Sequence, residues 1–223
     1  MLARIHDVLE IDAEQFLQAQ SSAPEWVVES LRRTPFVVVR RGPISEWEIP
    51  IGVRGAQRNE RWAAACPASL INSIQTPQSL RGRKVAAPRD TAIPALRSLP
   101  LLIQRWRDLD CSWGPGGSVG FELATGRQIA RPQSDLDVVI YARTRMTTND
   151  ARSLLDAAQG LPAVVDVRVE TPICGFSLVE YASRAPAPIL LRAASGAILA
   201  TDPWSEPGAT SASSAMASSD GGP

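Results

Sequence analysis

Ser134-Asp135-Leu136-Asp137-Val138-Val139-Ile140 is the stretch that decides the fold, because it sets two carboxylates at the start of an apolar, β-branched run. On a β-strand, residues i and i+2 point to the same face and lie about 6.5–7 Å apart. Asp135 and Asp137 therefore aim at one point, whereas the apolar side chains beside them face the other way. Hard divalent cations prefer oxygen ligands, and two of them about 3.5–4 Å apart suit an in-line attack at phosphorus. The stretch predicts a strand that serves nucleotidyl transfer.

A glycine-rich turn, Gly116-Gly117-Ser118, lies upstream of this strand and precedes a short helix predicted over 119–125, with Gly126 closing it. Glycines let the backbone approach a phosphate, and a helix N-terminus offers free N–H groups and a favourable dipole. Such a turn is also common without any ligand. The aspartate pair that follows it favours the phosphate-binding interpretation.

A third carboxylate comes from an alternating strand predicted over 164–170, after a helix predicted over 148–159. Its valines face one way, and Asp166, Arg168 and Glu170 face the other. If this strand neighbours the first one, Asp166 projects toward the same cations. The alternative is that these three polar residues form a solvated face.

The rest of the chain predicts a mixture of strands and helices. The expected elements are a strand pair within 35–55, a short helix over 58–65, a linker over 77–88, two short helices or one kinked helix over 91–110, a short helix over 177–182, and a hairpin of 189–193 with 197–200. We therefore predict an α+β fold. A mixed sheet with flanking helices forms a catalytic domain over 81–204, and a smaller α/β domain covers 1–80. The tail, 205–223, is rich in Ser, Ala and Gly without periodicity, which predicts disorder.

Charge and cysteine content narrow the function classes. The 223 residues carry no net charge, which argues against a protein that coats nucleic acid. Residues 32–107 nevertheless hold fourteen Arg or Lys against four Asp or Glu, which suits a substrate with several phosphates, although a solvated arginine-rich surface is the alternative. The three cysteines form no C-x-x-C pair, so neither a disulfide framework nor a zinc site is indicated. With no signal peptide and no long apolar run, we expect a cytoplasmic protein without a membrane partner.

Several segments carry a family resemblance. Gly117-Ser118, Asp135-x-Asp137 and a later strand aspartate resemble the polymerase-beta-type nucleotidyltransferase superfamily. More specific are the segments 53–55, 58–63, 113–126, 166–172 and 175–181, which read VRG, RNERWA, WGPGGSVGFELATG, DVRVETP and GFSLVEY. They are similar to the phosphoribosyl-dephospho-coenzyme A transferases of malonate decarboxylase, also called malonate decarboxylase holo-acyl-carrier-protein synthases. The likeness runs from about residue 4 to Trp204.

The resemblance implies a specific reaction. The family takes 2′-(5″-triphosphoribosyl)-3′-dephospho-coenzyme A as donor and transfers its phosphoribosyl-dephospho-coenzyme A part to a serine of the apo acyl carrier subunit, while pyrophosphate leaves. By motif matching, Asp135 and Asp137 are the catalytic aspartates. We expect them to bind two Mg²⁺ ions, with Asp166 as a further ligand and as the acceptor of the serine proton.

Phosphate contacts are expected from two further groups. The backbone of Gly117 and Ser118 holds the leaving pyrophosphate, and Arg54, Arg58 and Arg61 neutralise the triphosphate through bidentate contacts. Ser118 is not expected to act as a nucleophile, because the chain has a single histidine to serve as its base.

Other interpretations remain open from the sequence. The chain fits a nucleotidyltransferase that acts on a different protein, a tRNA or a small-molecule hydroxyl, and it also fits an inactive transferase-like assembly subunit. His6 is either a substrate contact oriented by Asp7 or a structural residue. Trp62 either stacks on adenine or belongs to the core.

Overall fold

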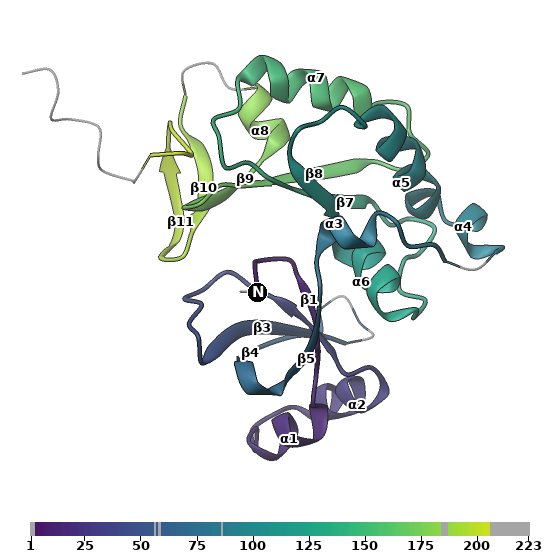
Figure 1. Cartoon of the computed structure of the whole chain (residues 1–223), viewed down its shortest axis with the longest axis vertical. Helices are drawn as coiled ribbons and strands as arrows, with labels where there is room; N and C mark the ends of the chain where they lie inside the picture. The colour runs from purple at the N-terminus through teal and green to yellow at the C-terminus, as the bar shows by residue number, and fades with distance from the viewer. Residues whose placement is uncertain (1–2, 56, 58, 86, 184–186, 206–223) are drawn as a thin grey trace, which may run out of the picture.

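Two β-sheets lie one above the other, with helices at the outer side of each (Figure 1). The structure is a computed structural model that describes residues 3–55, 57, 59–85, 87–183 and 187–205. The α+β class predicted from the sequence is confirmed. The tail predicted to be disordered lies, from residue 206 on, outside the described residues.

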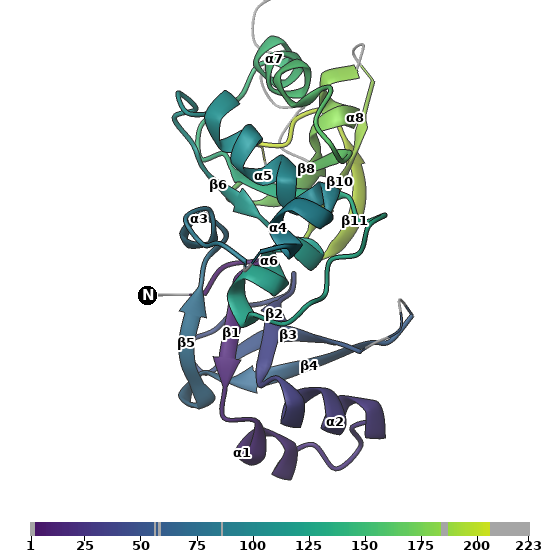
Figure 2. The ribbon, with the colours of Figure 1, turned by 90° about the vertical axis from the view of Figure 1, so that its right-hand side faces the viewer.

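The first sheet is antiparallel throughout, with strand order β4-β3-β2-β1-β5. Its strands are β1 (Val8–Ile11), β2 (Phe36–Val39), β3 (Glu48–Arg54), β4 (Arg61–Pro67) and β5 (Ile71–Gln75), and its helical segments are α1 (Ala13–Gln18), α2 (Glu25–Arg33) and the short η1 (Ala68–Leu70). The side chains of Leu9, Phe16, Leu31 and Ile51 are fully buried between the sheet and the helices. The helices α1 and α2 lie at the end farthest from the second sheet (Figure 2).

The helix expected over 58–65 is wrong, because this segment contains strand β4. Alanine favours helix, and this segment contains Ala63, Ala64 and Ala65. In the fold, β4 pairs with β3 at seven consecutive positions, from Arg54↔Arg61 to Glu48↔Pro67. The backbone groups of β4 thereby gain partners along the edge of the sheet, and this tertiary pairing outweighs local propensity.

Three helices connect the sheets: α3 (Pro77–Leu80), α4 (Arg89–Ala92) and α5 (Pro94–Arg105). The segment expected as a linker over 77–88 thus begins with the helix α3, which Thr76 caps. Leu80 of this helix is buried in the hydrophobic core of the second sheet, described below. The sequence signals for this helix are Thr76 followed by a proline at its first position. Two short helices or one kinked helix were expected over 91–110 because of Pro100. Instead, Pro100 lies inside the single helix α5, and the break from α4 falls earlier, at Ile93 before the helix-initiating Pro94.

The second sheet has the order β11-β10-β9-β8-β7-β6, and only β7 and β8 are parallel to each other. Its strands are β6 (Ser112–Pro115), β7 (Leu136–Tyr141), β8 (Val165–Glu170), β9 (Cys174–Ser177), β10 (Ile189–Ala193) and β11 (Gly196–Ala200), and its helices are α6 (Gly117–Thr125), α7 (Thr148–Ala158) and α8 (Leu178–Ser183). The helices predicted near 119–125, 148–159 and 177–182, the two strands between them and the C-terminal hairpin are confirmed within one or two residues.

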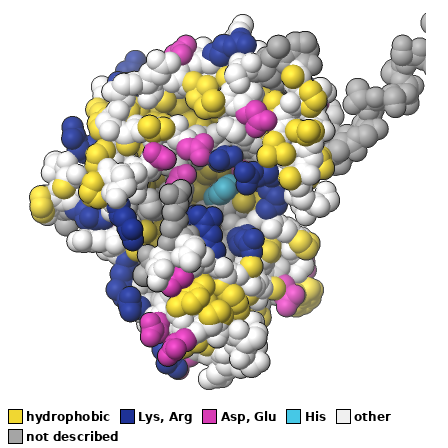
Figure 3. Space-filling view, turned by 180° about the vertical axis from the view of Figure 1, so that it is seen from behind, with side chains coloured by type: hydrophobic (Ala, Val, Ile, Leu, Met, Phe, Trp, Pro, Cys, Tyr) yellow, Lys and Arg dark blue, Asp and Glu magenta, His cyan; other side chains and the backbone are white. Residues whose placement is uncertain are grey.

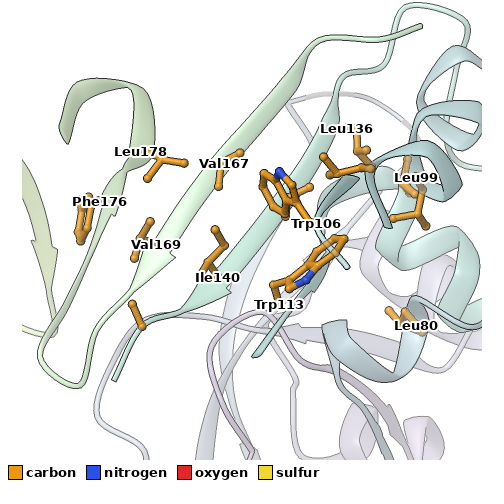
Figure 4. Packing of buried hydrophobic residues seen from close by; sticks show 14 of the residues in the cluster. Leu80, Leu99, Trp106, Trp113, Leu136, Ile140, Val167, Val169, Phe176 and Leu178 are labelled. Atoms are coloured by element: carbon orange, nitrogen blue, oxygen red, sulfur yellow. The ribbon is translucent and has the colours of Figure 1, made fainter. Parts of the chain in front are cut away.

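The larger core fills the space between this sheet and α5, α7 and α8, which cover the side away from the first sheet (Figures 1 and 2). Leu136, Ile140, Val167 and Val169 project from β7 and β8 into this core beside the pair Trp106 and Trp113 (Figure 4). The two indoles meet edge to face, with ring centroids 5.0 Å apart. One face of β7 and β8 is therefore fully committed to packing, which leaves their other face for the site.

The cysteines and the lengths of the helices bear on the remaining expectations. Cys66, Cys111 and Cys174 are all free thiols. Among the described helices, none has the length and apolar character needed to span a bilayer.

Candidate active site

Asp137 and Asp166 lie side by side because β7 and β8 run parallel and in register at these two residues. Their apolar neighbours Val138 and Val167 are buried on the opposite face, so alternation turns both carboxylates toward the first sheet. Asp137 is half-buried, whereas Asp135 directly precedes β7 and is exposed. The polar face of β8 thus turns toward the first sheet, where the side chains of Asp166 and Arg168 are 36% and 37% exposed.

Gly117 places the start of α6 directly against Asp137. The Gly116 N–H donates to the Asp137 carbonyl oxygen at 2.9 Å. Gly117 has a φ of +54°, and a Cβ added there would lie 1.7 Å from Asp137 Oδ2. Only glycine fits this position, both for its backbone conformation and for its contact with the carboxylate.

The Asp137 carboxylate is held in an unfavourable electrostatic environment. Burial, followed by the neighbouring Asp166, raises the pKa of Asp137, with a smaller contribution from Asp135, and Arg54 and Arg168 oppose the shift. Within the described part of the chain, no hydrogen bond or ion pair reaches the Asp137 carboxylate. Asp166 accepts a hydrogen bond from Arg168 Nη2 at 3.2 Å.

The charges of the Asp137 and Asp166 carboxylates suit a divalent cation, but the number of ligands that they provide is small. Two adjacent carboxylates, one of them desolvated and without a partner, repel each other, and a bound cation would remove this repulsion. However, no group of three or more His, Cys, Asp or Glu in the described ranges is arranged to hold a metal ion. The set of Asp135, Asp137 and Asp166 as Mg²⁺ ligands stays a prediction, with Asp137 and Asp166 as its central pair.

A cleft of about 750 Å³ opens between the two sheets above these carboxylates. Its walls come from both sheets, with Arg40, Arg54 and Arg61 on one side and Arg168 and Arg192 on the other. In Figure 3, basic side chains gather around the single histidine in this hollow, and acidic side chains lie next to them. A cleft that combines carboxylates with several guanidinium groups is suited to a polyphosphate accompanied by a metal ion.

Arg54 and Arg61 face the carboxylates because they are paired neighbours at the ends of β3 and β4. Desolvation in the cleft lowers the pKa of Arg54, the adjacent Arg61 lowers it further, and Asp137 opposes the change. This basic pair gives the carboxylate site a positively charged opposite wall.

The residues predicted as a site are partly brought together. Gly117, Asp137, Asp166, Arg54 and Arg61 all line the cleft. Asp135 lies beside the cleft, close enough to influence Asp137, and Ser118 is not among the lining residues. Arg58 lies outside the described residues.

His6 takes part in a cluster that sequence reasoning did not find. Its Nε2 lies 2.9 Å from Glu170 Oε1, and Arg41 Nη2 bonds the other oxygen of Glu170. Burial alone would raise the pKa of Glu170, but the hydrogen bonds and charges of His6 and Arg41 bring it below its ordinary value. The partners are far apart in sequence, so no local signal pointed to this connection between the two sheets.

Trp62 has a core role, because it meets Phe16 edge to face with centroids 6.3 Å apart and packs against the first core. It also contributes to the cleft lining. The core interpretation of this residue accounts for its position on β4, whose alternate residues are exposed.

Two family models together match most of the chain. Models of the N-terminal and C-terminal domains of phosphoribosyl-dephospho-CoA transferase MdcG match residues 4–77 and 79–203. The chain belongs to the phosphoribosyl-dephospho-CoA transferase family. The family resemblance drawn from the sequence is therefore confirmed.

Relatives that carry the name phosphoribosyl-dephospho-CoA transferase extend over most of the chain. The protein from Pseudomonas aeruginosa is 36% identical over 183 residues, which is 82% of this chain and 86% of the relative. The protein from Azotobacter vinelandii is 37% identical over 211 residues, or 92% and 96%. No solved structure matches the chain.

Membership of the phosphoribosyl-dephospho-CoA transferase family makes this chain an enzyme of the transferase class. The cleft draws on both matched regions, because Arg54 and Arg61 belong to the first and Asp137 and Asp166 to the second. An inactive assembly subunit is disfavoured by relatives that are named for catalysis.

Proposed function

We propose that this enzyme transfers the phosphoribosyl-dephospho-coenzyme A group from 2′-(5″-triphosphoribosyl)-3′-dephospho-coenzyme A to a serine of the apo acyl carrier subunit of malonate decarboxylase. Pyrophosphate is the leaving group. The name of the family supports the identity of the transferred group. The donor and the acceptor are proposed from the segments that resemble the enzymes of malonate decarboxylase.

One observation carries the proposal: the Asp137 and Asp166 carboxylates lie in register on parallel strands, opposite the Arg54 and Arg61 guanidinium groups and against the start of α6. This arrangement offers metal ligands, phosphate-neutralising cations and backbone N–H groups within one cleft. Nucleotidyl transfer from a triphosphate uses these three kinds of group together.

The proposed reaction is a substitution at the α-phosphorus of the triphosphate. The serine oxygen forms a bond to this phosphorus, and the bond from phosphorus to the bridging oxygen of pyrophosphate breaks. The proton of the serine hydroxyl passes to a carboxylate oxygen, for which we propose Asp166. Because Asp166 already accepts a hydrogen bond from Arg168, its free oxygen is oriented before substrate arrives.

Mg²⁺ would be held by Asp137 and Asp166, with Asp135 completing the set, and when bound it lowers the pKa of the attacking hydroxyl and neutralises phosphate charge. Arg54 and Arg61 reach the triphosphate from the other wall through guanidinium contacts. The backbone N–H groups at Gly117 and Ser118 receive the departing pyrophosphate at the first turn of α6.

The direct test is mass spectrometry of the apo acyl carrier subunit after incubation with the enzyme, the triphosphoribosyl donor and Mg²⁺. We expect a mass increase equal to the phosphoribosyl-dephospho-coenzyme A group on a serine. Replacing the donor with labelled ATP distinguishes a general nucleotidyltransferase, since the proposal requires preference for the triphosphoribosyl donor.

Variants at the aspartates test the assignment of roles. We expect Asp135→Ala and Asp137→Ala to abolish transfer while circular dichroism stays native. Near-native transfer by either variant would show that the carboxylate has no catalytic role.

A further inference from the structure

The cleft has a second end, away from the carboxylate pair. Along β8, Asp166, Arg168 and Glu170 share one face, and Glu170 lies about 13 Å beyond Asp166 at the usual rise of a strand. Glu170 also lines the cleft, together with His6, Arg41 and Arg192. The carboxylate pair thus occupies only part of the space between the sheets.

The floor of this second end is a row of three residues across three strands. Glu170 on β8 pairs with Gly175 on β9, which pairs with Arg192 on β10. A Cβ at Gly175 would lie 2.3 Å from Arg41 Nη2 and 2.6 Å from Glu170 Oε1. Gly175 therefore leaves a depression that lets Arg41 reach Glu170 from the first sheet.

The charges at this end do not cancel. Glu170 is fully engaged by Arg41 and His6. Arg192 and Arg40 are exposed, and within the described part of the chain neither of their guanidinium groups forms an ion pair. Arg40 packs over β3, since a Cβ at Gly52 would lie 2.8 Å from its Cδ. One excess cation thus comes from each wall of the cleft.

We infer that Arg40 and Arg192 form a second phosphate subsite that binds the 5′-diphosphate of the dephospho-coenzyme A part of the donor. This inference rests on the proposed function for the identity of the donor. That molecule carries two separate phosphate groups, a triphosphate and a diphosphate, with two linked riboses between them. The cleft likewise carries more than one basic group. Arg54 and Arg61 lie near the metal ligands, Arg192 lies in the strand row of Glu170 and Gly175, and Arg40 lies over Gly52 on the facing wall.

The arrangement favours a diphosphate over a single small anion. Guanidinium groups bind phosphate oxygens in a bidentate manner, and two of them on opposite walls match two phosphates. The Arg41–Glu170 pair between the walls holds the floor in place without consuming the charge of Arg192. A ligand bound here would extend from the depression at Gly175 toward Asp166.

The test measures binding without reaction, by calorimetric titration of the full chain in a chelating buffer. The probe is 3′-dephospho-coenzyme A, which has the diphosphate but no triphosphoribosyl group, and the comparison is adenosine with pantetheine, which lack it. We expect dephospho-coenzyme A to bind and the pair lacking diphosphate to bind far more weakly. Arg192→Gln and Arg40→Gln should each weaken binding about 10- to 100-fold, the loss expected for a charge-assisted contact.

The controls separate the subsite from the proposed function. Arg97→Gln, at an exposed position of α5 outside the cleft, should bind as the wild type does. Asp137→Asn should keep dephospho-coenzyme A binding even though transfer is lost. Unchanged affinity in both Arg192→Gln and Arg40→Gln would overturn the subsite, whether or not transfer occurs. Arginine-dependent binding without any transfer to the acyl carrier subunit would instead overturn the proposed function and leave the subsite standing.

Discussion

Replacing Gly117 by alanine perturbs the contact that aligns α6 with the aspartate strand. The position has a φ of +54°, and the new Cβ would lie 1.7 Å from Asp137 Oδ2 and 2.9 Å from Asp137 Cβ. The left-handed backbone costs about 1–2 kcal/mol for a non-glycine residue. Relieving the overlap by displacing the strand or the helix costs about 1–3 kcal/mol more. We expect Gly117→Ala to lower the free energy of unfolding by about 2–5 kcal/mol in total.

Gly126 is a matched control at the other end of the same helix. It has a φ of +72°, but an added Cβ would meet nothing within 4 Å. Gly126→Ala should therefore cost only the backbone part, about 1–2 kcal/mol, and leave transfer unchanged. Gly117→Ala should also lose transfer, because the carboxylate that it displaces belongs to the site.

The assay is urea unfolding followed by circular dichroism, with transfer measured on the same preparations. Equal losses of stability in Gly117→Ala and Gly126→Ala would refute the contact between Gly117 and Asp137. A double variant with Asp137→Ala provides a second check, since removing the carboxylate should recover part of the loss seen in Gly117→Ala.

Three further predictions follow from the electrostatics. Without metal, Asp137→Asn should raise the melting temperature, because it removes a desolvated charge whose pKa is raised by burial and by Asp166. Added Mg²⁺ should raise the melting temperature of the wild type only, and thermal scans measure both effects. The pKa of Glu170 is lowered in the folded protein, so the stability that its carboxylate contributes is present above the ordinary pKa of 4.5 and is lost as pH falls through the lower folded pKa. In acid unfolding, Glu170→Gln should not show this pH-dependent loss of stability. Arg89→Ala leaves the buried Glu122 carboxylate without its ion pair and should cost about 3 kcal/mol in urea unfolding.

Local sequence patterns determined much of the second sheet. The alternation of valines with polar residues predicted β8, and the apolar β-branched run predicted β7. The apolar stripe of Ala151, Leu154, Leu155 and Ala158 predicted α7, and in the structure Thr147 and Asp150 form a capping box at its start. These elements could be predicted because each packs one face against the core, so that its apolar residues recur at a regular spacing in the sequence.

Short and edge elements escaped prediction. Strand β6 spans four residues with a glycine and a proline, and it is stabilised by its pairing with β7 and by the fully buried Trp113. Strand β4 carries an alanine run that favours helix in isolation, yet it pairs with β3 along its length. In both cases the deciding contacts come from another strand, so local propensity had no access to them.

The sequence by itself determined the strand that bears Asp137, the strand that bears Asp166 and the glycine turn at Gly117, because spacing and periodicity are local properties. Only the tertiary structure decided that Arg54 and Arg61 face those carboxylates and that Arg41 joins Glu170 across the cleft. These contacts join residues far apart in the chain, and they depend on how two sheets pack against each other, which no pattern within either sheet encodes.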